Sequence, residues 1–292
     1  MITVITPTYN RVGIIKNVYD SLLNQTNYDF EWIVIDDGSK DNTKEMIDSF
    51  IKDKKIKISY FFKQNGGKHT ALNLGIKKAK GDYILILDSD DTLLPDAIEK
   101  VIKKWEQYDA DKSVACLSFL KVYPNNQTIG KEYNGSDIKS NNIDFRYNQN
   151  LLGDMCEVFK TEILKKYPFP VYENERFLSE AIVWNQIAFD YNTIYINEPI
   201  YVADYLTDGL SKNWFKLVVN NPLGARANNL LFMSKEFKFK IRLKNCIMFD
   251  VFSIIAKKPI LKETKMKFFA ALFYIPSFII AKILEYKFKK KN

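Results

Sequence analysis

The chain contains 292 residues, with 43 lysines and arginines, 35 aspartates and glutamates, one histidine and three cysteines. Its hydrophobic fraction of 47% and charged fraction of 27% are typical of a globular protein and exclude wholesale disorder. The cysteines are odd in number and far apart, so we expect neither a disulfide scaffold nor a thiolate zinc site. With one histidine, a divalent metal would be bound by carboxylates, which favours Mg²⁺ or Mn²⁺ over Zn²⁺.

The formal net charge of +8 is unevenly distributed along the chain. Residues 235–292 carry 15 basic and 4 acidic side chains, whereas residues 1–234 carry 28 and 31. The basic excess therefore belongs to a C-terminal tail and does not indicate a nucleic-acid-binding domain. The first residues form no basic stretch followed by an apolar one, so no secretory signal is expected and we predict a cytoplasmic protein.

Apolar runs rich in β-branched residues alternate with segments of helical spacing over the first 120 residues. The expected strands are Ile2–Thr6, Trp32–Ile35, Ile56–Phe62, Tyr83–Leu87 and Val114–Leu120. The expected helices are Val12–Leu23, Asn42–Ile51, Ala71–Ala79 and Pro95–Tyr108. This alternation predicts an α/β fold with a mostly parallel central sheet flanked by helices, and ligands outside the carboxyl ends of its strands.

Beyond residue 121 the pattern is looser. A loop or weak hairpin is expected over Tyr123–Asn150, and a helix from Ser179 to about Tyr191. The remaining expected elements are strands near Ile194–Ile196 and Ile200–Ala203 and a helix from Asn213 to about Lys235. We divide the chain into residues 1–121, 122–212 and 213–292.

The tail contains two uncharged stretches, Cys246–Ala256 and Phe268–Ala281, and Pro276 interrupts the second. Both are shorter than the roughly 20 residues needed to span a bilayer. Basic, aromatic-rich helices of this kind suit the membrane interface. Alternatively, they pack on the body of the protein or on another subunit.

Polar clusters follow the first two predicted strands. In Thr6-Pro7-Thr8-Tyr9-Asn10-Arg11, Pro7 is expected to end the strand, and Tyr9 to line a pocket for a flat ring. In Asp36-Asp37-Gly38-Ser39, two adjacent carboxylates cannot both be buried, so at least one should face the crevice. We favour Asp36 as an acceptor for a base N–H or ribose hydroxyls, although helix capping explains part of this cluster.

Two further clusters follow the next strands. Asn65-Gly66-Gly67-Lys68-His69 opens a helix, where glycines, a helix N-terminus and Lys68 favour phosphate; His69 is either a structural hydrogen-bonder or a phosphate neighbour. In Asp88-Ser89-Asp90-Asp91, alternation puts Asp88 and Asp90 on one side, where a hard cation would relieve their repulsion. The alternative is a solvated turn with Asp91 or Thr92 as a helix cap, which accounts for one carboxylate and not three.

In order and spacing, these four clusters resemble the family-2 glycosyltransferases of the GT-A fold over roughly residues 1–210. The resemblance implies an inverting transferase with a nucleotide-sugar donor, commonly UDP-linked, and a divalent metal. It implies a nucleotide-sugar-binding half at 1–121 and an acceptor-binding half at 122–212. Together with the chemistry of the clusters, it predicts nucleotide contacts at Pro7, Tyr9, Asp36, Asn65, Lys68, Asp88 and Ser89 and a metal ligand at Asp90.

The segment Arg176–Trp184 resembles the family region where an acidic residue, often in a Glu-Asp pair, begins a helix. Ala181 replaces the second acid, so the resemblance leaves Glu180 as the general base of a single displacement. Alternatively, Glu180 is a favourable acid in a first helical turn. His69, Asp154 and Ser211 are possible donor or acceptor contacts, or turn residues.

We therefore expect a glycosyltransferase bound peripherally to the inner face of the membrane through residues 235–292. Its expected acceptor is a cell-surface glycan or a lipid-linked precursor; no nucleic acid is expected as a partner, and an oligomer is possible. One alternative is an inactive nucleotide-sugar-binding subunit that anchors a glycan-assembly complex. Another, a nucleotidyltransferase, would need a Gly-rich loop where this chain has Thr8-Tyr9-Asn10-Arg11.

Overall fold

The computed structural model describes residues 1–289 except 131, 133–134, 152 and 204–213. The strands are β1 (Ile2–Thr8), β2 (Phe30–Asp36), β3 (Ile58–Phe62), β4 (Tyr83–Ile86), β5 (Thr92–Leu93), β6 (Val114–Val122), β7 (Ile138–Ser140), β8 (Met155–Lys160) and β9 (Asn192–Val202). The helices are α1 (Ile15–Leu23), α2 (Thr43–Asp53), α3 (Lys68–Lys78), α4 (Ala97–Tyr108), the π-helix η1 (Ile143–Asn148), α5 (Thr161–Leu164), α6 (Ala181–Ile187), α7 (Trp214–Asn220), α8 (Pro222–Leu231), α9 (Phe239–Ile255), α10 (Lys267–Leu272) and α11 (Tyr274–Phe288).

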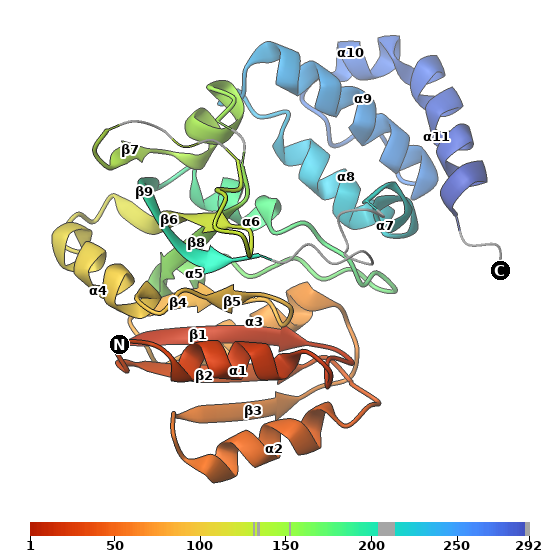
Figure 1. Ribbon diagram of the computed structural model, residues 1–292. Coiled ribbons are helices and arrows are strands. Elements are labelled where there is room, and N and C mark those ends of the chain that lie inside the picture. Colours follow the sequence, from red (N-terminus) through yellow and green to blue (C-terminus); the bar gives the residue numbers. More distant parts are fainter. Residues whose placement is uncertain (131, 133–134, 152, 204–213, 290–292) are drawn as a thin grey trace.

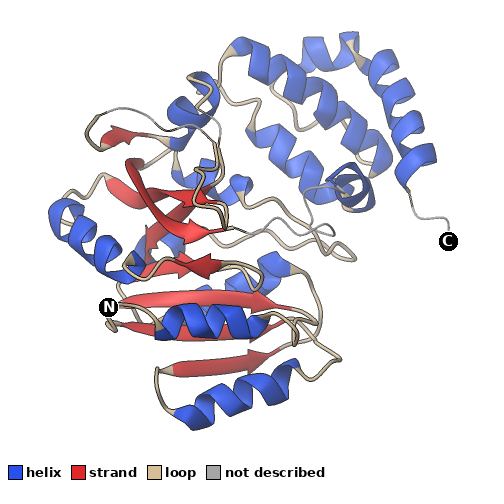
Figure 2. Ribbon diagram, in the orientation of Figure 1, coloured by secondary structure: helices blue, strands red, loops and turns tan. Residues whose placement is uncertain are grey.

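The strands of the described residues form one sheet in the order β3-β2-β1-β4-β8-β6-β9-β5, with β7 paired to β9 (Figures 1 and 2). Strands β1 to β4 are parallel to one another, as predicted. Strand β8 runs antiparallel to both β4 and β6, which makes the second half of the sheet mixed. The five strands predicted before residue 121 are confirmed, and each end lies within two residues of its predicted position.

Both faces of the sheet are buried because side chains alternate along each strand. Val4 and Trp32 pack in a core shared with α1, α2 and α4. Ile5 and Ile33 face the other way, into a core shared with α3 and α6. The parallel strands therefore bring their polar carboxyl ends to one edge, between the two helical layers.

Some elements differ from the sequence prediction. The two short strands expected after residue 193 form a single strand, β9, with register shifts around Pro199. The helix expected from residue 213 to about 235 is two helices, α7 and α8, because the chain turns at Asn221 and Pro222 begins the second one. The stretch Phe268–Ala281 breaks at Phe273, while Pro276 lies in the first turn of α11, where its missing N–H costs no bond.

Helices α7 to α11 form a unit beside the sheet, which we call the C-terminal extension (residues 214–289; Figure 1). Within it α9 packs against α8, α10 and α11, and α8 packs against α6, which belongs to residues 122–212. Arg226 of α8 joins this unit by donating to Ser253 Oγ, at 2.8 Å, and to Glu263 and the Pro259 carbonyl, each at 2.9 Å. The extension is therefore a packed unit docked on the body, as the alternative interpretation of the tail proposed.

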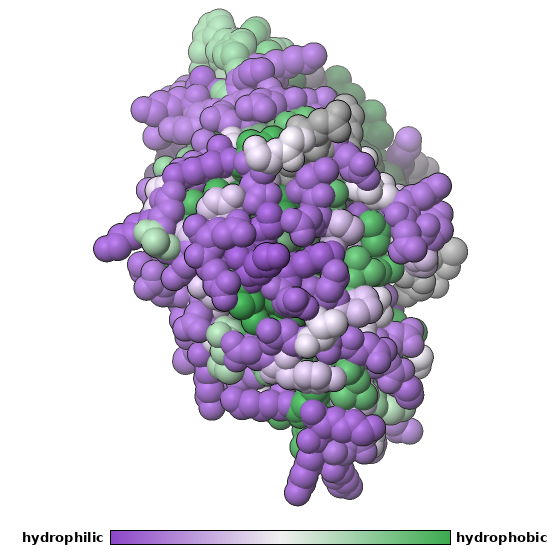
Figure 3. All heavy atoms as spheres, turned by 60° about the vertical axis from the view of Figure 1, so that its left-hand side comes forward, coloured by the Kyte–Doolittle hydropathy of each residue, from purple (hydrophilic) through white to green (hydrophobic). Residues whose placement is uncertain are grey.

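One face of the extension remains apolar and exposed. No helix within the described residues is long and apolar enough to cross a membrane. A stripe on α10 and α11, here called the α10–α11 face, consists of exposed side chains spaced three or four residues apart: Phe268, Leu272, Ile275, Ile279, Ile283 and Tyr286. The face of the molecule seen in Figure 3 is, by contrast, predominantly hydrophilic. The exposed apolar surface is thus concentrated on two helices.

Candidate functional site

The carboxylates that follow β2 lie below the surface. Asp36 is 1% exposed and Asp37 4% exposed, so the expectation that the two carboxylates cannot both be buried is wrong. Their burial is tolerated because each carboxylate accepts hydrogen bonds. Asp36 accepts one from the Ser39 N–H and one from the Tyr60 hydroxyl, both at 2.7 Å. Burial, and then the Asp36 carboxylate, raise the pKa of Tyr60, so this hydroxyl remains a donor.

Asp37, to which the sequence analysis gave no role, organises the glycine loop after β3. Its carboxylate accepts from the N–H groups of Gly66, at 3.0 Å, and Gly67, at 2.7 Å. It also accepts from Asn65 Nδ2 at 3.2 Å and forms an ion pair with Lys63 at 2.6 Å. The predicted contact residue Asn65 is therefore fixed by Asp37. The sequence does contain a signal for this contact: the carboxylate follows β2, the glycine loop follows β3, and these two strands are parallel neighbours.

Gly67 brings two distant parts of the chain together. Its φ of +94° is unfavourable for other residues, and a Cβ atom there would lie 2.0 Å from the carbonyl oxygen of Arg176. The backbone at Arg176 thus lies directly on the start of α3. Lys68, the next residue, is thereby placed within reach of Glu180.

Lys68, Asp88 and Glu180 form one cluster, here called the Lys68 cluster. The Lys68 ammonium lies 2.6 Å from an Asp88 oxygen and 2.8 Å from a Glu180 oxygen. Each of the three side chains is about 30% exposed, so the cluster opens to solvent on one side. Burial alone would lower the pKa of Lys68, but the two carboxylates raise it. Burial opposes ionisation of Asp88, yet Lys68 holds its pKa below the ordinary value.

The acidic turn after β4 continues from this cluster. Asp90 is partly exposed, and its carboxylate lies 3.6 Å from the Arg11 guanidinium. Asp91 accepts from the Tyr201 hydroxyl at 2.7 Å, and that oxygen accepts from the Asp88 N–H at 3.1 Å. Burial raises the pKa of Asp91 to about 6. Ser89 is buried within the turn.

A metal site made by the protein alone is absent from the part of the chain described, where no three His, Cys, Asp or Glu side chains come together. Asp90 nevertheless fits a metal shared with a substrate. Mn²⁺ and Mg²⁺ are often bound by one or two carboxylates and completed by phosphate oxygens and water. Its partial exposure and its long contact to Arg11 leave an oxygen available for such binding.

The other predicted site residues are distributed as follows. Pro7 is buried and pairs with Ile35, so β1 continues one residue further than expected. Tyr9 is 44% exposed at the rim. His69 is 2% exposed, burial lowers the pKa of its imidazole, and its Nδ1 has no hydrogen-bond partner among the described residues. Ser211 lies outside the described residues.

Asp154 belongs to a group of ion-paired residues on β6, β8 and the segment between them, which the sequence analysis did not identify. Lys121 of β6 forms an ion pair with Asp154 at 3.0 Å and lies over the Tyr201 ring at 4.4 Å. Next to it, Arg146 pairs with Glu157 at 3.0 Å. Burial raises the pKa of Glu157 to about 7 even though Arg146 and Lys121 oppose the shift. The sequence signal for these ion pairs was the presence of charged residues, such as Lys121 and Glu157, within the otherwise apolar strands β6 and β8.

Comparisons with known proteins place this geometry in a family. The family model described as glycosyl transferase family 2 matches residues 3–167. The chain is 30% identical over 252 residues to a Campylobacter jejuni enzyme named GalNAc(5)-diNAcBac-PP-undecaprenol beta-1,3-glucosyltransferase, covering 82% of this chain and 78% of the relative. It spans only 15% of the length of an uncharacterized glycosyltransferase from Rickettsia bellii, to which it is 45% identical over 106 residues.

Solved structures share the architecture at low sequence identity. S. aureus TarS 1–349 superposes with a TM-score of 0.64 at 18% identity, covering 96% of this chain and 78% of that one. The mannosyltransferase PcManGT from Pyrobaculum calidifontis, solved with GDP-Man and Mn²⁺, gives a TM-score of 0.58 at 18% identity, covering 98% and 84%. The sheet, the order of its polar clusters and the matched family model agree: the chain belongs to glycosyl transferase family 2, a family of transferase enzymes with the GT-A fold.

Proposed function

We propose that the protein is an inverting glycosyltransferase that moves a sugar from a nucleotide-sugar donor, a UDP-sugar by preference, to a hydroxyl of a glycan or lipid-linked oligosaccharide. The Lys68 cluster carries this proposal. It puts a carboxylate of the acceptor half, Glu180, within 2.8 Å of an ammonium that also touches Asp88 of the donor half. A single displacement requires a base for the acceptor hydroxyl and a positive charge that faces the leaving diphosphate. Glu180 and Lys68 would supply these two groups at the same edge of the sheet.

The donor half, residues 1–121, would hold the nucleotide. Pro7, Tyr9 and Asn65 would surround the nucleoside at the carboxyl ends of the strands, and Asp88 and Ser89 would approach the ribose. Asp36 would act with its remaining lone pairs or through Tyr60, because both of its oxygens already accept a hydrogen bond. TarS, a structural neighbour, has been solved with UDP and with UDP-GlcNAc, which supports a UDP-linked donor.

Glu180 would take the proton from the acceptor hydroxyl. Its ion pair with Lys68 holds the carboxylate at the rim, and Lys68, at the N-terminus of α3, presents positive charge to the departing diphosphate. Asp90 would hold a divalent metal, which when bound neutralises charge on the leaving diphosphate. The Mn²⁺ in the PcManGT structure supports this assignment.

The C-terminal extension would place the enzyme on the inner face of the cell membrane. The α10–α11 face offers a continuous exposed apolar stripe, and lysines 267, 282, 287 and 289 on or beside the same helices suit anionic headgroups. The Campylobacter relative's name denotes an acceptor linked to undecaprenol through a diphosphate, which supports a lipid-linked acceptor here.

One experiment separates an enzyme from an inactive scaffold subunit. Calorimetry with UDP, GDP and TDP, with and without Mn²⁺, identifies the nucleotide and the metal dependence. Glu180→Gln should then abolish transfer while leaving donor affinity unchanged, because the amide cannot accept the proton. Glu173→Gln, at an exposed position shortly before the segment Arg176–Trp184, is the matched control and should remain active. Equal activity of both variants would contradict the assignment of Glu180.

A further inference from the structure

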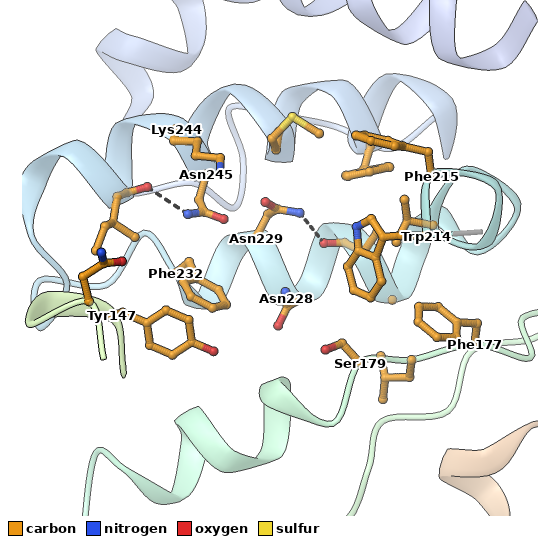
Figure 4. A pocket seen from close by; sticks show the side chains of 18 residues that line it. Tyr147, Phe177, Ser179, Trp214, Phe215, Asn228, Asn229, Phe232, Lys244 and Asn245 are labelled. Carbon is orange, nitrogen blue, oxygen red and sulfur yellow. Dashed lines mark hydrogen bonds between the residues drawn. The ribbon is translucent and has the colours of Figure 1, made fainter. Parts of the chain in front are cut away.

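A cavity of about 560 Å³ lies between the C-terminal extension and the acceptor half, outside the Lys68 cluster. Its volume falls within the roughly 300–1,000 Å³ of small-molecule sites. Helices α7, α8 and α9 form one side, and the segment Phe177–Ser179 and Tyr147 form the other (Figure 4). The cavity therefore exists only because the extension is docked on the body.

The lining combines aromatic rings with amides. Trp214, from α7, meets Phe177 edge-on at 5.5 Å between ring centroids and is 44% exposed. Asn228, from α8, lies between Tyr147 and Ser179 in Figure 4. Its amide oxygen is buried and lacks a hydrogen-bond partner among the described residues. A buried acceptor of this kind normally has a partner, so its position in a cavity points to a ligand that donates.

Two more amides are arranged in the same way. Asn229 Nδ2 donates to the Ala225 carbonyl at 2.7 Å, and Asn245 Nδ2 donates to the Ile241 carbonyl at 2.8 Å. Both bonds go to the preceding turn of their own helix, and in the described part of the chain neither amide oxygen accepts a bond. The cavity thus presents several hydrogen-bond acceptors next to flat apolar rings.

We infer that this cavity binds a pyranose unit of the saccharide acceptor. A pyranose carries hydroxyl donors around its edge and C–H groups on its faces, which match amide oxygens and aromatic rings respectively. A hydrocarbon chain would leave the amide oxygens unpaired. Ser179 lines the cavity and the next residue is Glu180, with Cα atoms about 3.8 Å apart across one peptide bond. The wall of the cavity therefore leads directly into the residue proposed as the base, whose carboxylate lies on Lys68.

This inference rests on the proposed function, but saccharide binding can be measured separately, through the fluorescence of Trp214. Of the four tryptophans, Trp32 and Trp105 are fully buried and Trp184 packs on Phe159 at 4.4 Å, whereas Trp214 is largely exposed and lines the cavity. Fluorescence of the full chain would be titrated with a panel of methyl pyranosides and short oligosaccharides in the presence of UDP. A bound sugar ring should shift the emission to shorter wavelength, because it removes Trp214 from water.

Substitutions in the cavity, measured by NMR, test the same inference without relying on the fluorescence of Trp214. Saturation-transfer NMR with the best saccharide of the panel should show binding weakened about threefold to tenfold by Trp214→Ala and by Asn228→Leu, as one lost ring contact or hydrogen bond implies. Tyr28→Ala, which removes an aromatic ring that is 56% exposed and does not line the cavity, is the matched control and should bind the saccharide normally. UDP affinity should be the same in all of these variants.

Other results would overturn the inference. One is that UDP binds normally but no saccharide gives a signal. Another is that a saccharide gives a signal that Trp214→Ala and Asn228→Leu leave unchanged. The proposed function would survive either result. A Trp214 shift caused by a short-chain prenyl phosphate and by no saccharide would assign the cavity to a lipid chain instead. Failure to bind any nucleotide would remove the proposed function itself, and with it this inference.

Discussion

The parallel half of the sheet and the C-terminal extension place their polar groups by different means. In the parallel half, buried carboxylates such as Asp37 accept several bonds from a neighbouring loop, and their positions follow from strand ends. In the extension, the carboxylate of Asp250 is fully buried, and neither of its oxygens has a partner among the described residues. The buried carboxylates therefore stabilise the parallel half, whereas the buried carboxylate of Asp250 lowers the stability of the extension. The following changes test this difference.

The largest effect is expected at Gly67. In Gly67→Ala a Cβ atom would lie 2.0 Å from the Arg176 carbonyl oxygen at a φ of +94°, so the start of α3 and the acceptor half must separate. We expect a loss of about 4 kcal/mol or more in the free energy of unfolding, together with loss of activity. Gly13→Ala, where nothing lies within 4 Å, is the control and should change little. Urea unfolding measures both, and equal curves would show that the contact is not tight.

In the extension, Asp250 should give a pH-dependent effect. Burial raises its pKa from 3.8 to about 7, so the folded protein binds a proton more tightly than the unfolded chain. The contribution of Asp250 to the free energy of unfolding is therefore greatest below about pH 4, falls as the pH rises towards 7 and is constant above that. Asp250→Asn should remove this fall and raise the free energy of unfolding at pH 8 by about 2–4 kcal/mol.

Thermal unfolding across pH 4–8 measures that difference. Asp20→Asn, at an exposed ion pair on α1, is the matched control and should retain the pH dependence of the original chain. Identical pH profiles for the original chain and Asp250→Asn would show that this carboxylate has a partner or water in solution.

A smaller effect is expected at Asp90, in the turn after β4. Asp90→Asn should weaken the Mn²⁺-dependent part of UDP affinity about tenfold, equivalent to about 1.4 kcal/mol, and leave metal-free binding and the thermal midpoint unchanged. Asp96→Asn, in the solvent-exposed ion pair with Lys100, serves as the control. Calorimetry with and without metal measures this effect, and an unchanged metal dependence would remove Asp90 from its proposed role.

The smallest effect on the fold is expected on the α10–α11 face. Ile279 is 54% exposed, so Ile279→Lys should change the free energy of unfolding by less than about 0.5 kcal/mol. Cosedimentation with anionic vesicles should nevertheless fall several-fold, since a charge replaces apolar surface at the interface. Substitution of Val171, equally exposed but far from these helices in sequence, by Lys should leave vesicle binding intact. If Ile279→Lys bound vesicles normally, this face would not be the membrane contact.

Prediction from sequence succeeded where local pattern and topology agree. Alternation in Ile2–Thr8 and Phe30–Asp36 defined the parallel strands, and the rule that ligands lie at their carboxyl ends located Lys68 and Asp88. Lys68 and Glu180 are 112 positions apart in the sequence, so their contact could be anticipated only through the family resemblance. The burial of both Asp36 and Asp37 was missed because their donors, Tyr60 and the loop amides, come from other elements.

The extension was predicted less well for the same reason. Whether an apolar helix faces a membrane or another helix depends on its neighbours, and α9 and α11 have similar composition but different environments. The break between α7 and α8 at Pro222 has a local signal, whereas the break at Phe273 has none that we can identify.

The contact between Gly67 and Arg176 also has a consequence for synthesis of the protein. A nascent chain exposes its donor half first, yet Glu180 and the backbone that lies on Gly67 emerge more than 100 residues later. Until then Gly67 and the start of α3 lack the backbone segment that covers them in the folded protein. A chain that ends before residue 176 would therefore leave the start of α3 uncovered, and Lys68 would lack its ion pair with Glu180.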